Sequence, residues 1–256
     1  KKHGYQGLDF SLGDIQSAGG PSAVKEILAK HGLEPSTVGG VLGAQVVVPE
    51  EEWAPALAQV REKAQQAAAV GGTRTGTVLP CRADDPKETL WPLVVKRIKQ
   101  LDEALEGTGV RLGMEFLGVK TLRLERPHAF VQSMAEFNQL LEEAGAKNVG
   151  ITLDSYHWYS AGDSLETIEQ TPAERIVLLH VNDAKDLPRE QLMDQDRLLP
   201  GEGVIPLADW LRAIDSTGFD GFIALEVLGP RIAEMDAEER ARIGKETIGP
   251  LLAALG

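Results

Sequence analysis

Short apolar runs alternate with longer amphipathic segments along the whole chain. The apolar runs are rich in Val, Ile and Leu and are bounded by turn residues, which is typical of buried strands. They are GLDF at 7–10, the stretch at 37–46, GTVLPC at 76–81, RLGMEFLG at 111–118, VGITLDSY at 149–156, IVLLHVND at 176–183 and GFIALEVL at 221–228. Amphipathic helices are predicted at 21–32, 51–72, 87–107 and 127–145, each ending near a glycine. This repeated strand–helix order predicts an α/β fold with a parallel sheet.

The predicted strands are almost continuously apolar, as strands are when helices cover both faces of a parallel sheet. A closed (β/α)8 TIM barrel needs eight strands, whereas this sequence predicts seven. The opening residues KKHGYQGLDF are typical of the end of a helix that leads into a strand. We therefore expect a TIM barrel whose first β-strand and most of whose first helix are absent from the sequence. An open seven-stranded sheet is the alternative.

Composition narrows the class of protein. With 256 residues, 43% of them hydrophobic, the chain can bury one large core, so we expect a single domain over residues 1–256. The 39 acidic and 26 basic side chains give a net charge of −13, which would repel a phosphate backbone, so no nucleic-acid partner is expected. No apolar run reaches the roughly 18 residues of a membrane span. Because Cys81 is the one cysteine, no internal disulfide can form, and we expect a cytoplasmic protein without a membrane partner.

Four of the predicted strands carry a polar side chain close to the carboxyl end. In a barrel these ends meet at one mouth, where a buried charge costs several kcal/mol unless it is paired or bound to a metal. Each residue alone is better explained by a buried ion pair or a core histidine, but four at the same end favour a shared metal. Three carboxylates and one imidazole suit one divalent ion such as Mn²⁺, Mg²⁺ or Co²⁺, with Zn²⁺ as an alternative. The four residues are Glu115, Asp154, His180 and Glu226.

Five motifs carry a family resemblance: MEFLG, GITLDSYHWY, LLHVNDAKD, DQDRLLPGEGVIPL and ALEVLGP. They resemble the xylose isomerase-like TIM barrels of sugar phosphate isomerases and epimerases, and most closely the inosose (2-keto-myo-inositol) isomerase branch. The resemblance is strong from Arg111 to Gly229 and otherwise rests on the order of strands and helices. It implies that Glu115, Asp154, His180 and Glu226 bind one divalent metal, and that His157 and Arg197 contact oxygens of the substrate. The segment VKTLRLERPHAF after the first of these glutamates is longer than the family pattern.

Two of these positions have competing interpretations. His157 lies just past a strand and could be a histidine of a surface loop. Arg197 could instead pair with one of its two neighbouring aspartates in a solvated loop. We also expect Asn182 and Asp183, which follow the same strand as His180, to hold the imidazole in its ligating tautomer.

The ligand set and the resemblance together predict chemistry next to a carbonyl group. A divalent ion can coordinate adjacent ketone and hydroxyl oxygens and so stabilise an enediolate. We expect Glu115 and Glu226 to act as the base and acid that move the proton between two carbons or two faces of one carbon. The predicted protein is a metal-dependent isomerase or epimerase of a sugar, sugar phosphate or inosose. Its partner is a small-molecule ketose or inosose, and a homo-oligomer suits such a barrel.

Three alternatives remain open. A dehydratase on the same scaffold, of the inosose or 3-dehydroshikimate type, would expel a hydroxyl group from the same intermediate. An endonuclease IV-like DNA-repair enzyme is disfavoured by the acidic composition and by too few histidines for a three-zinc site. A non-catalytic metabolite-binding barrel is disfavoured because both glutamates expected to transfer the proton are present.

Overall fold

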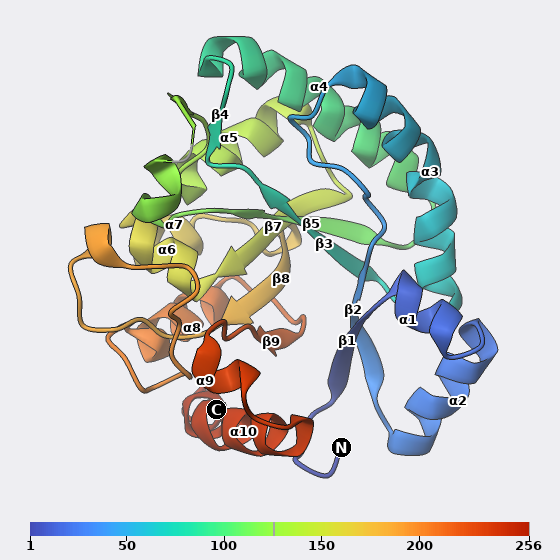
Figure 1. Cartoon of the computed structure of the whole chain (residues 1–256), viewed down its shortest axis with the longest axis vertical. Helices are drawn as coiled ribbons and strands as arrows, with labels where there is room; N and C mark the ends of the chain where they lie inside the picture. Colours follow the sequence, from blue (N-terminus) through green and yellow to red (C-terminus); the bar gives the residue numbers. More distant parts are fainter. Residues whose placement is uncertain (125, 256) are drawn as a thin grey trace.

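A ring of parallel strands surrounded by helices forms the body of the molecule (Figure 1). The computed structural model describes residues 1–124 and 126–255, so residues 125 and 256 of the expected domain lie outside the described residues. The ring strands are β1 (Gly7–Ser11), β2 (Glu34–Gly39), β3 (Arg74–Leu79), β5 (Arg111–Phe116), β7 (Val149–Asp154), β8 (Ile176–Val181) and β9 (Ile223–Leu225). The α/β architecture predicted from the alternating pattern is therefore confirmed.

Helices connect the ring strands on the outside. They are α1 (Leu12–Ser17), α2 (Pro21–His31), α3 (Glu50–Ala69), α4 (Lys87–Leu105), α5 (Met134–Ala144), α6 (Ser155–Ala161), α7 (Leu165–Glu169), α8 (Leu207–Ser216), α9 (Pro230–Ala233) and α10 (Ala237–Ala253). Short 3-10 turns form η1 (Lys120–Leu124), η2 (Ala173–Arg175) and η3 (Arg189–Gln191). Among the described residues, no helix is both long and apolar enough to cross a membrane.

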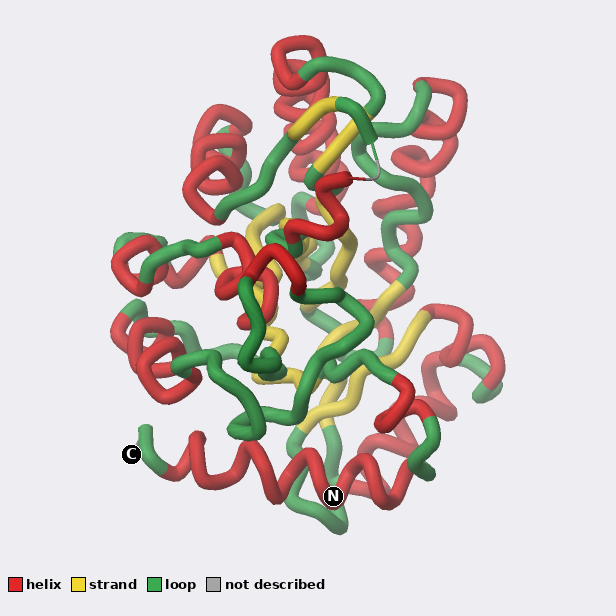
Figure 2. Tube along the Cα trace, turned by 60° about the vertical axis from the view of Figure 1, so that its left-hand side comes forward, coloured by secondary structure: helices red, strands yellow, loops and turns green. Residues whose placement is uncertain are grey.

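Hydrogen bonding divides the ring into two parallel sheets. One sheet contains β1 and β2, and the other has the order β3-β5-β7-β8-β9. Strand β2 packs beside β3, so the two sheets follow one another around the ring (Figure 2). A separate antiparallel pair, β4 (Arg82–Ala83) with β6 (His128–Ala129), joins two loops above the ring. Within the described part of the chain, β9 has no ladder partner besides β8, and β1 has none besides β2.

The buried faces follow from the sequence pattern. Every residue of β7 and five of the six residues of β5 are buried, as expected for strands enclosed by side chains on one face and helices on the other. Helix α8 buries Leu207, Trp210, Leu211 and Ile214, which recur on one side of a 3.6-residue period. The core therefore fills both the ring interior and the layer between strands and helices.

Capping residues decide where several elements end. The strand predicted at 149–156 stops at Asp154, because this side chain accepts hydrogen bonds from the backbone N–H groups of Tyr156 and His157 and so begins α6. The helix predicted at 127–145 begins only at Met134, after Ser133 caps its first turn. The strand predicted at 37–46 ends at Gly39, since Gly40 turns the chain with a φ of +92°.

Candidate metal centre at the carboxyl ends of the strands

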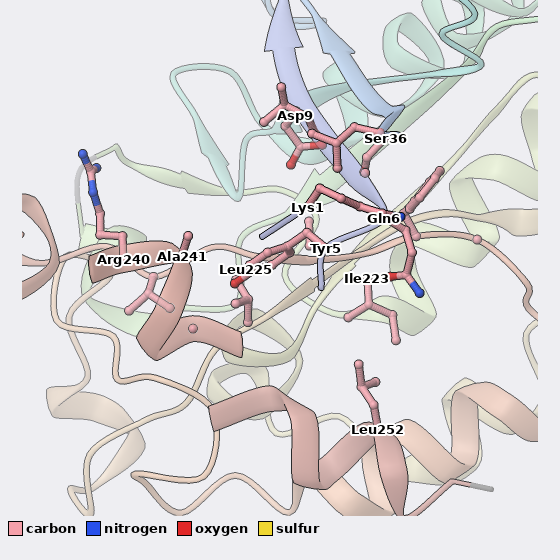
Figure 3. A pocket seen from close by; sticks show the side chains of 18 of the residues that line it. Lys1, Tyr5, Gln6, Asp9, Ser36, Ile223, Leu225, Arg240, Ala241 and Leu252 are labelled. Carbon is pink, nitrogen blue, oxygen red and sulfur yellow. The ribbon is translucent and has the colours of Figure 1, made fainter. Parts of the chain in front are cut away.

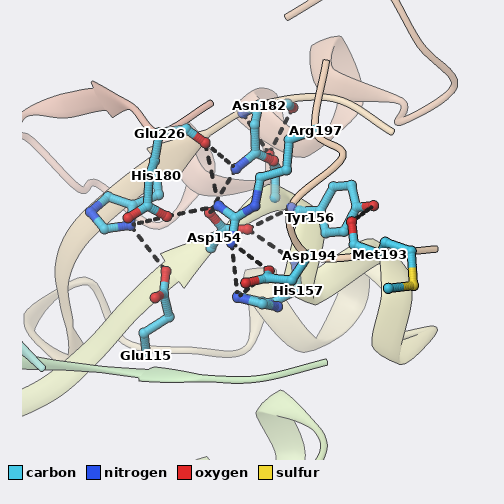
Figure 4. A network of polar contacts seen from close by, with 11 residues as sticks. Glu115, Asp154, Tyr156, His157, His180, Asn182, Met193, Asp194, Arg197 and Glu226 are labelled. Carbon is cyan, nitrogen blue, oxygen red and sulfur yellow. Dashed lines mark hydrogen bonds and ion pairs between the residues drawn. The ribbon is translucent and has the colours of Figure 1, made fainter. Parts of the chain in front are cut away.

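Strand register brings the four predicted ligands to one level of the ring (Figure 4). Asp154 at the end of β7 lies opposite His180 on β8, Glu115 belongs to the neighbouring β5, and Glu226 directly follows β9. Each residue offers one ligand atom, and these four atoms all lie within 4.8 Å of one another. The structure thus brings together the four side chains for which the sequence predicts a shared site.

The His180 ring joins two carboxylates. Its Nδ1 lies 3.0 Å from Oε1 of Glu115 and 3.3 Å from Oε2 of Glu226. Burial disfavours the imidazolium, but the hydrogen bonds to these carboxylates outweigh it and raise the pKa of His180 well above its usual value. Burial raises the pKa of Glu115 despite the bond to His180. For Glu226, burial is outweighed by His180 and by the charge of Arg197, which lower its pKa to about 2.

Asp154 is fully buried and fixed by four donors. Its Oδ1 accepts from the backbone N–H groups of Tyr156, at 2.7 Å, and His157, at 3.0 Å. Its Oδ2 accepts from Nδ2 of Asn182, at 2.8 Å, and from Nη1 of Arg197, at 3.0 Å. A buried carboxylate with this number of donors keeps one orientation, which preorganises the centre.

Arg197 extends from a loop into the cluster. Its Nη1 lies 2.7 Å from Oε2 of Glu226, its Nη2 donates to Oδ1 of Asp194 at 2.8 Å, and its side chain is 2% exposed. Burial opposes the charge, but the surrounding carboxylates raise the pKa of Arg197 above its usual value. The solvated-loop interpretation is therefore wrong, although the pairing with Asp194 is present. The other neighbouring aspartate, Asp196, pairs with Lys185 instead.

His157 lies on α6 beneath the same guanidinium. It is fully buried, and its Nε2 lies 3.2 Å from Nη2 of Arg197 and 3.7 Å from Oδ1 of Asp194. Its Nδ1 has no hydrogen-bond partner among the described residues. The surface-loop interpretation is wrong, and the imidazole belongs to the polar cluster.

The expectation that Asn182 and Asp183 orient His180 is wrong. Within the described residues, neither side chain bonds to the His180 ring. The amide of Asn182 instead donates to Asp154 and, at 3.1 Å, to the backbone carbonyl of Glu226, so it links two of the predicted ligands. Both residues follow the end of β8 at Val181, and their side chains bond to Asp154 and to backbone N–H groups of the following loop instead.

Asp183 holds the loop that carries Arg197, a role that the sequence analysis missed. Its Oδ2 accepts from the N–H groups of Gly201, at 3.0 Å, and Gly203, at 2.9 Å. Its Oδ1 accepts from the N–H of Ile205 at 2.9 Å. A Cβ at Gly203 would lie 2.1 Å from a backbone oxygen, so the loop approaches the strand end closely enough to require glycine there. The sequence signal for this role is a buried aspartate after a strand, followed by a loop with two glycines.

The long segment at 119–130 packs against a neighbouring loop. Lys120 pairs with Glu190 of η3, and the Thr121 hydroxyl donates to the carbonyl of Leu192 at 3.0 Å. Arg123 donates to the carbonyls of Gly118 and Gln132 and so ties the ends of the segment together. Residue 125 of this segment lies outside the described residues.

The donor set fits a divalent metal ion. Three carboxylates and one imidazole nitrogen converge, and the acidic side chains of the cluster, with Asp194, outnumber Arg197 and His180. Mostly oxygen donors with one nitrogen suit Mn²⁺, Mg²⁺ or Co²⁺, and Zn²⁺ accepts the same ligand types. Glu115, Asp154, His180 and Glu226 are the residues that would hold the ion.

Comparison with known sequences assigns this chain to a family. Residues 1–248 match the family described as xylose isomerase-like TIM barrel. An inosose isomerase of Bacillus velezensis is 29% identical over 161 residues, which cover 63% of this chain and 55% of that protein. A 3-dehydroshikimate dehydratase of Pseudomonas aeruginosa is 28% identical over 137 residues, covering 53% of this chain and 20% of that protein. The chain thus spans about half the length of the inosose isomerases it matches.

Solved structures show the same fold. A xylose isomerase domain protein from Alicyclobacillus acidocaldarius is 32% identical, with a TM-score of 0.89 over 99% of this chain and 91% of that chain. The IOLI protein, solved with a bound zinc atom, is 23% identical, with a TM-score of 0.86 over 100% of this chain and 91% of that chain. At this lower identity the second likeness shows the fold alone.

Proposed function

Because this chain belongs to the xylose isomerase-like TIM barrel family, we propose that it is a divalent-metal-dependent isomerase or epimerase of a sugar, sugar phosphate or inosose. One observation carries the proposal. Glu115 and Glu226 both contact Nδ1 of His180 within a single cluster of four ligand atoms. Two carboxylates that approach one point from different strands can exchange a proton with the two carbons of a substrate held between them.

The proposed metal ligands are Glu115, Asp154, His180 and Glu226. When bound, the ion would polarise the substrate carbonyl and offset the negative charge that develops on its oxygen as a neighbouring C–H bond is broken. The protein contributes the fixed geometry, because the donors around Asp154 and the register of β7 with β8 leave these side chains little freedom.

The two glutamates differ in their surroundings, which suits an acid–base pair. Glu115 is buried, and this burial raises its pKa, so it holds a proton more readily than an exposed glutamate does. Glu226 is partly exposed and stays ionised, because His180 and Arg197 lower its pKa to about 2. In the proposed reaction one of these groups removes a proton from carbon and the other returns a proton. Isomerisation and epimerisation differ only in the carbon or face to which it returns.

Arg197 and His157 are proposed to hold oxygens of the substrate. Their side chains lie 3.2 Å apart next to Glu226, so an oxygen that they bind would lie beside a carboxylate of the acid–base pair. Guanidinium and imidazole N–H groups are donors suited to hydroxyl and carbonyl oxygens. The buried position of both groups strengthens such bonds by excluding water.

The similarity to inosose isomerases makes 2-keto-myo-inositol the first substrate to test. The metal-loaded protein would be incubated in D2O with this inosose or with ketohexoses and followed by NMR. We expect deuterium to enter at the carbon next to the carbonyl without loss of water, and chelation by EDTA to stop the exchange until metal is restored. If the metal-loaded protein exchanges no proton of any of these substrates, that result would count against the proposal.

The dehydratase is the second candidate, since 3-dehydroshikimate dehydratases are also similar to this chain. It would use the same first proton transfer but would expel a hydroxyl group from the adjacent carbon. The same NMR experiment, extended to 3-dehydroshikimate, separates the two functions. An enone or aromatic product with release of water would favour the dehydratase over the isomerase.

A further inference from the structure

Asn182 belongs to a buried hydrogen-bond network beside the predicted ligands (Figure 4). It directly follows β8 and is fully buried. Its Nδ2 donates to Oδ2 of Asp154 at 2.8 Å and to the backbone carbonyl of Glu226 at 3.1 Å. One amide group therefore connects the end of β7 to the residue after β9, across the end of the strand that lies between them.

Ser155 fixes the direction in which this amide points. Its hydroxyl accepts a hydrogen bond from the backbone N–H of Asn182 at 3.0 Å and donates to Oδ1 of the same residue at 2.8 Å. The amide oxygen thus faces a donor, while Nδ2 faces the acceptor oxygens of Asp154 and Glu226. A reversed amide would place Oδ1 against those two oxygens, so the network holds asparagine in one orientation. Ser155 is also fully buried, so water does not compete for these bonds.

The sheet holds Glu226 less firmly than it holds the other three predicted ligands. Glu115, Asp154 and His180 each lie within a strand and pair with a neighbouring strand in a parallel ladder. Glu226 comes after the last residue of β9, and its backbone N–H bonds to the carbonyl of Val181 at 3.3 Å. Its side chain is 35% exposed, against 10% for that of Glu115. The direction of Glu226 therefore needs support from outside its own strand.

Packing around β9 supplies little of this support. Every residue of β9 is only half-buried, and the strand borders a cavity of about 900 Å³ whose other side is formed by β1 (Figure 3). None of the four predicted metal ligands lines this cavity. Within the described residues, two side chains donate to the backbone carbonyl of Glu226, Asn182 at 3.1 Å and Arg197 at 3.3 Å. Asn182 makes the shorter of these two bonds.

We propose that Asn182, in the metal-dependent reaction on which this inference rests, is a positioning residue that sets the separation of Asp154 from Glu226. A carboxylate that binds a metal and also moves a proton has to keep its place to within about 0.5 Å. The amide donates without carrying a charge, so it orients both residues without offsetting the negative charge that attracts a cation. Ser155 keeps the amide in the orientation that serves both of them.

Co²⁺ binding to Asn182→Leu tests the proposal, because leucine keeps the branched shape of the side chain but has no donor. Calorimetric titration should show a Co²⁺ affinity lowered roughly 10- to 100-fold, as for other groups that bond to metal ligands. At saturating Co²⁺ the visible absorption spectrum should also change, because it reports the coordination geometry. Asn138→Leu is the matched control, since its amide donates to the Thr171 hydroxyl at 2.9 Å but lies on the outer helix α5. Its Co²⁺ affinity and spectrum should match those of the unsubstituted protein.

A milder variant covers the case in which Asn182→Leu does not fold. Ser155→Ala removes the hydroxyl but leaves the amide, so its Co²⁺ affinity should fall in the same direction by a smaller factor. Unchanged affinity and spectrum in Asn182→Leu, a loss of thermal stability alone, or an equal loss of affinity in Asn138→Leu overturns the proposal. If only Ser155→Ala folds, an unchanged affinity and spectrum in that variant overturns it.

Turnover separates the role of Asn182 from the proposed function. At saturating metal, Asn182→Leu should lower kcat by a larger factor than it raises KM, because Glu226 is displaced while Arg197 and His157 still hold the substrate. A raised KM with unchanged kcat overturns the alignment of Glu226 by Asn182. Weaker Co²⁺ binding in Asn182→Leu, with no turnover of any substrate by the unsubstituted protein, overturns the proposed function and supports the positioning role. An unsubstituted protein that binds no Co²⁺ overturns both.

Discussion

Among single residues, Arg197 shows how the protein balances its buried negative charge. Its guanidinium lies between Asp154, Glu226 and Asp194 while its side chain is almost completely enclosed. Without this cation, three carboxylates would face one another in a medium that screens charge poorly. Arg197 therefore contributes to the stability of the centre as well as being proposed to bind substrate.

The first prediction concerns this balance. In metal-free protein, Arg197→Met should lower the free energy of unfolding by about 3–5 kcal/mol, because it leaves buried carboxylates without their partner. Arg212→Met is the matched control. Arg212 pairs with Asp209 on the exposed face of α8, so this substitution should lower the free energy of unfolding by less than about 1 kcal/mol. Urea unfolding of both variants measures the difference. Equal losses in the two variants would show that the cluster does not depend on Arg197.

The second prediction concerns proton transfer. Glu226→Gln should reduce turnover by roughly 10²- to 10⁴-fold, because the amide keeps the shape of the side chain but cannot exchange the proton. Circular dichroism and thermal unfolding should show an intact fold. Glu246→Gln, on the exposed side of α10, should leave turnover unchanged. A Glu226→Gln protein with undiminished activity would eliminate Glu226 from the acid–base pair.

The third prediction concerns pH. In metal-free protein the raised pKa of His180 keeps a proton on the imidazole, whereas a metal ligand must be neutral. Metal affinity should therefore rise with pH, by about tenfold per unit, until the pH exceeds this raised pKa. Calorimetric titration in buffers of different ionisation enthalpy should detect the released proton. An affinity that stays constant with pH, with no proton released, would contradict the assignment of His180 as a ligand.

Strand ends and the loops after them govern the site at the scale of elements. The existence and order of the ring strands are predictable from their apolar runs, because a parallel sheet buries both faces. Their ends are less predictable, since Asp154 both ends β7 and caps α6, and this depends on the backbone path rather than on hydrophobicity. Within the segment at 127–133, which the sequence predicts as the start of a helix, His128 and Ala129 instead form the short strand β6, which pairs with β4.

The fourth prediction tests the loop held by Asp183. Asp183→Asn replaces an acceptor oxygen by an NH2 group facing the backbone N–H groups of Gly201 and Gly203, so the loop that carries Arg197 should move. We expect kcat/KM to fall by about 10- to 100-fold, because small displacements of positioning groups are costly. Metal affinity should change less than kcat/KM, since Asp183 itself does not contact the predicted ligands.

Asp186→Asn, an exposed change in the same loop, serves as the control for this loop variant and should behave like the unsubstituted protein. A purely structural role for Asp183 would lower thermal stability without changing kcat/KM of the folded fraction. That result would show that Asp183 does not help to position the substrate.

For the whole molecule, the ring topology explains why residues far apart in sequence converge. The sequence predicts that Glu115, Asp154, His180 and Glu226 share one end of a parallel sheet, and the structure brings their ligand atoms within 4.8 Å. The family resemblance implies that Arg197 contacts the substrate, but the pattern of apolar positions does not predict how this side chain enters the cluster, because the path of the loop at 197–205 depends on tertiary hydrogen bonds to a strand end. The order of the parallel strands can thus be predicted from the pattern of apolar residues, whereas the positions of the loops cannot.

X-ray absorption spectroscopy of the Zn²⁺-loaded protein tests the central claim most directly. One ion bound per chain by Glu115, Asp154, His180 and Glu226 should show oxygen and nitrogen neighbours at about 2.0–2.2 Å with the scattering signature of a single imidazole. That signature should vanish in His180→Gln. Sulfur in the first shell, two or more imidazoles, or an unchanged spectrum in the variant would contradict a metal held by these four side chains.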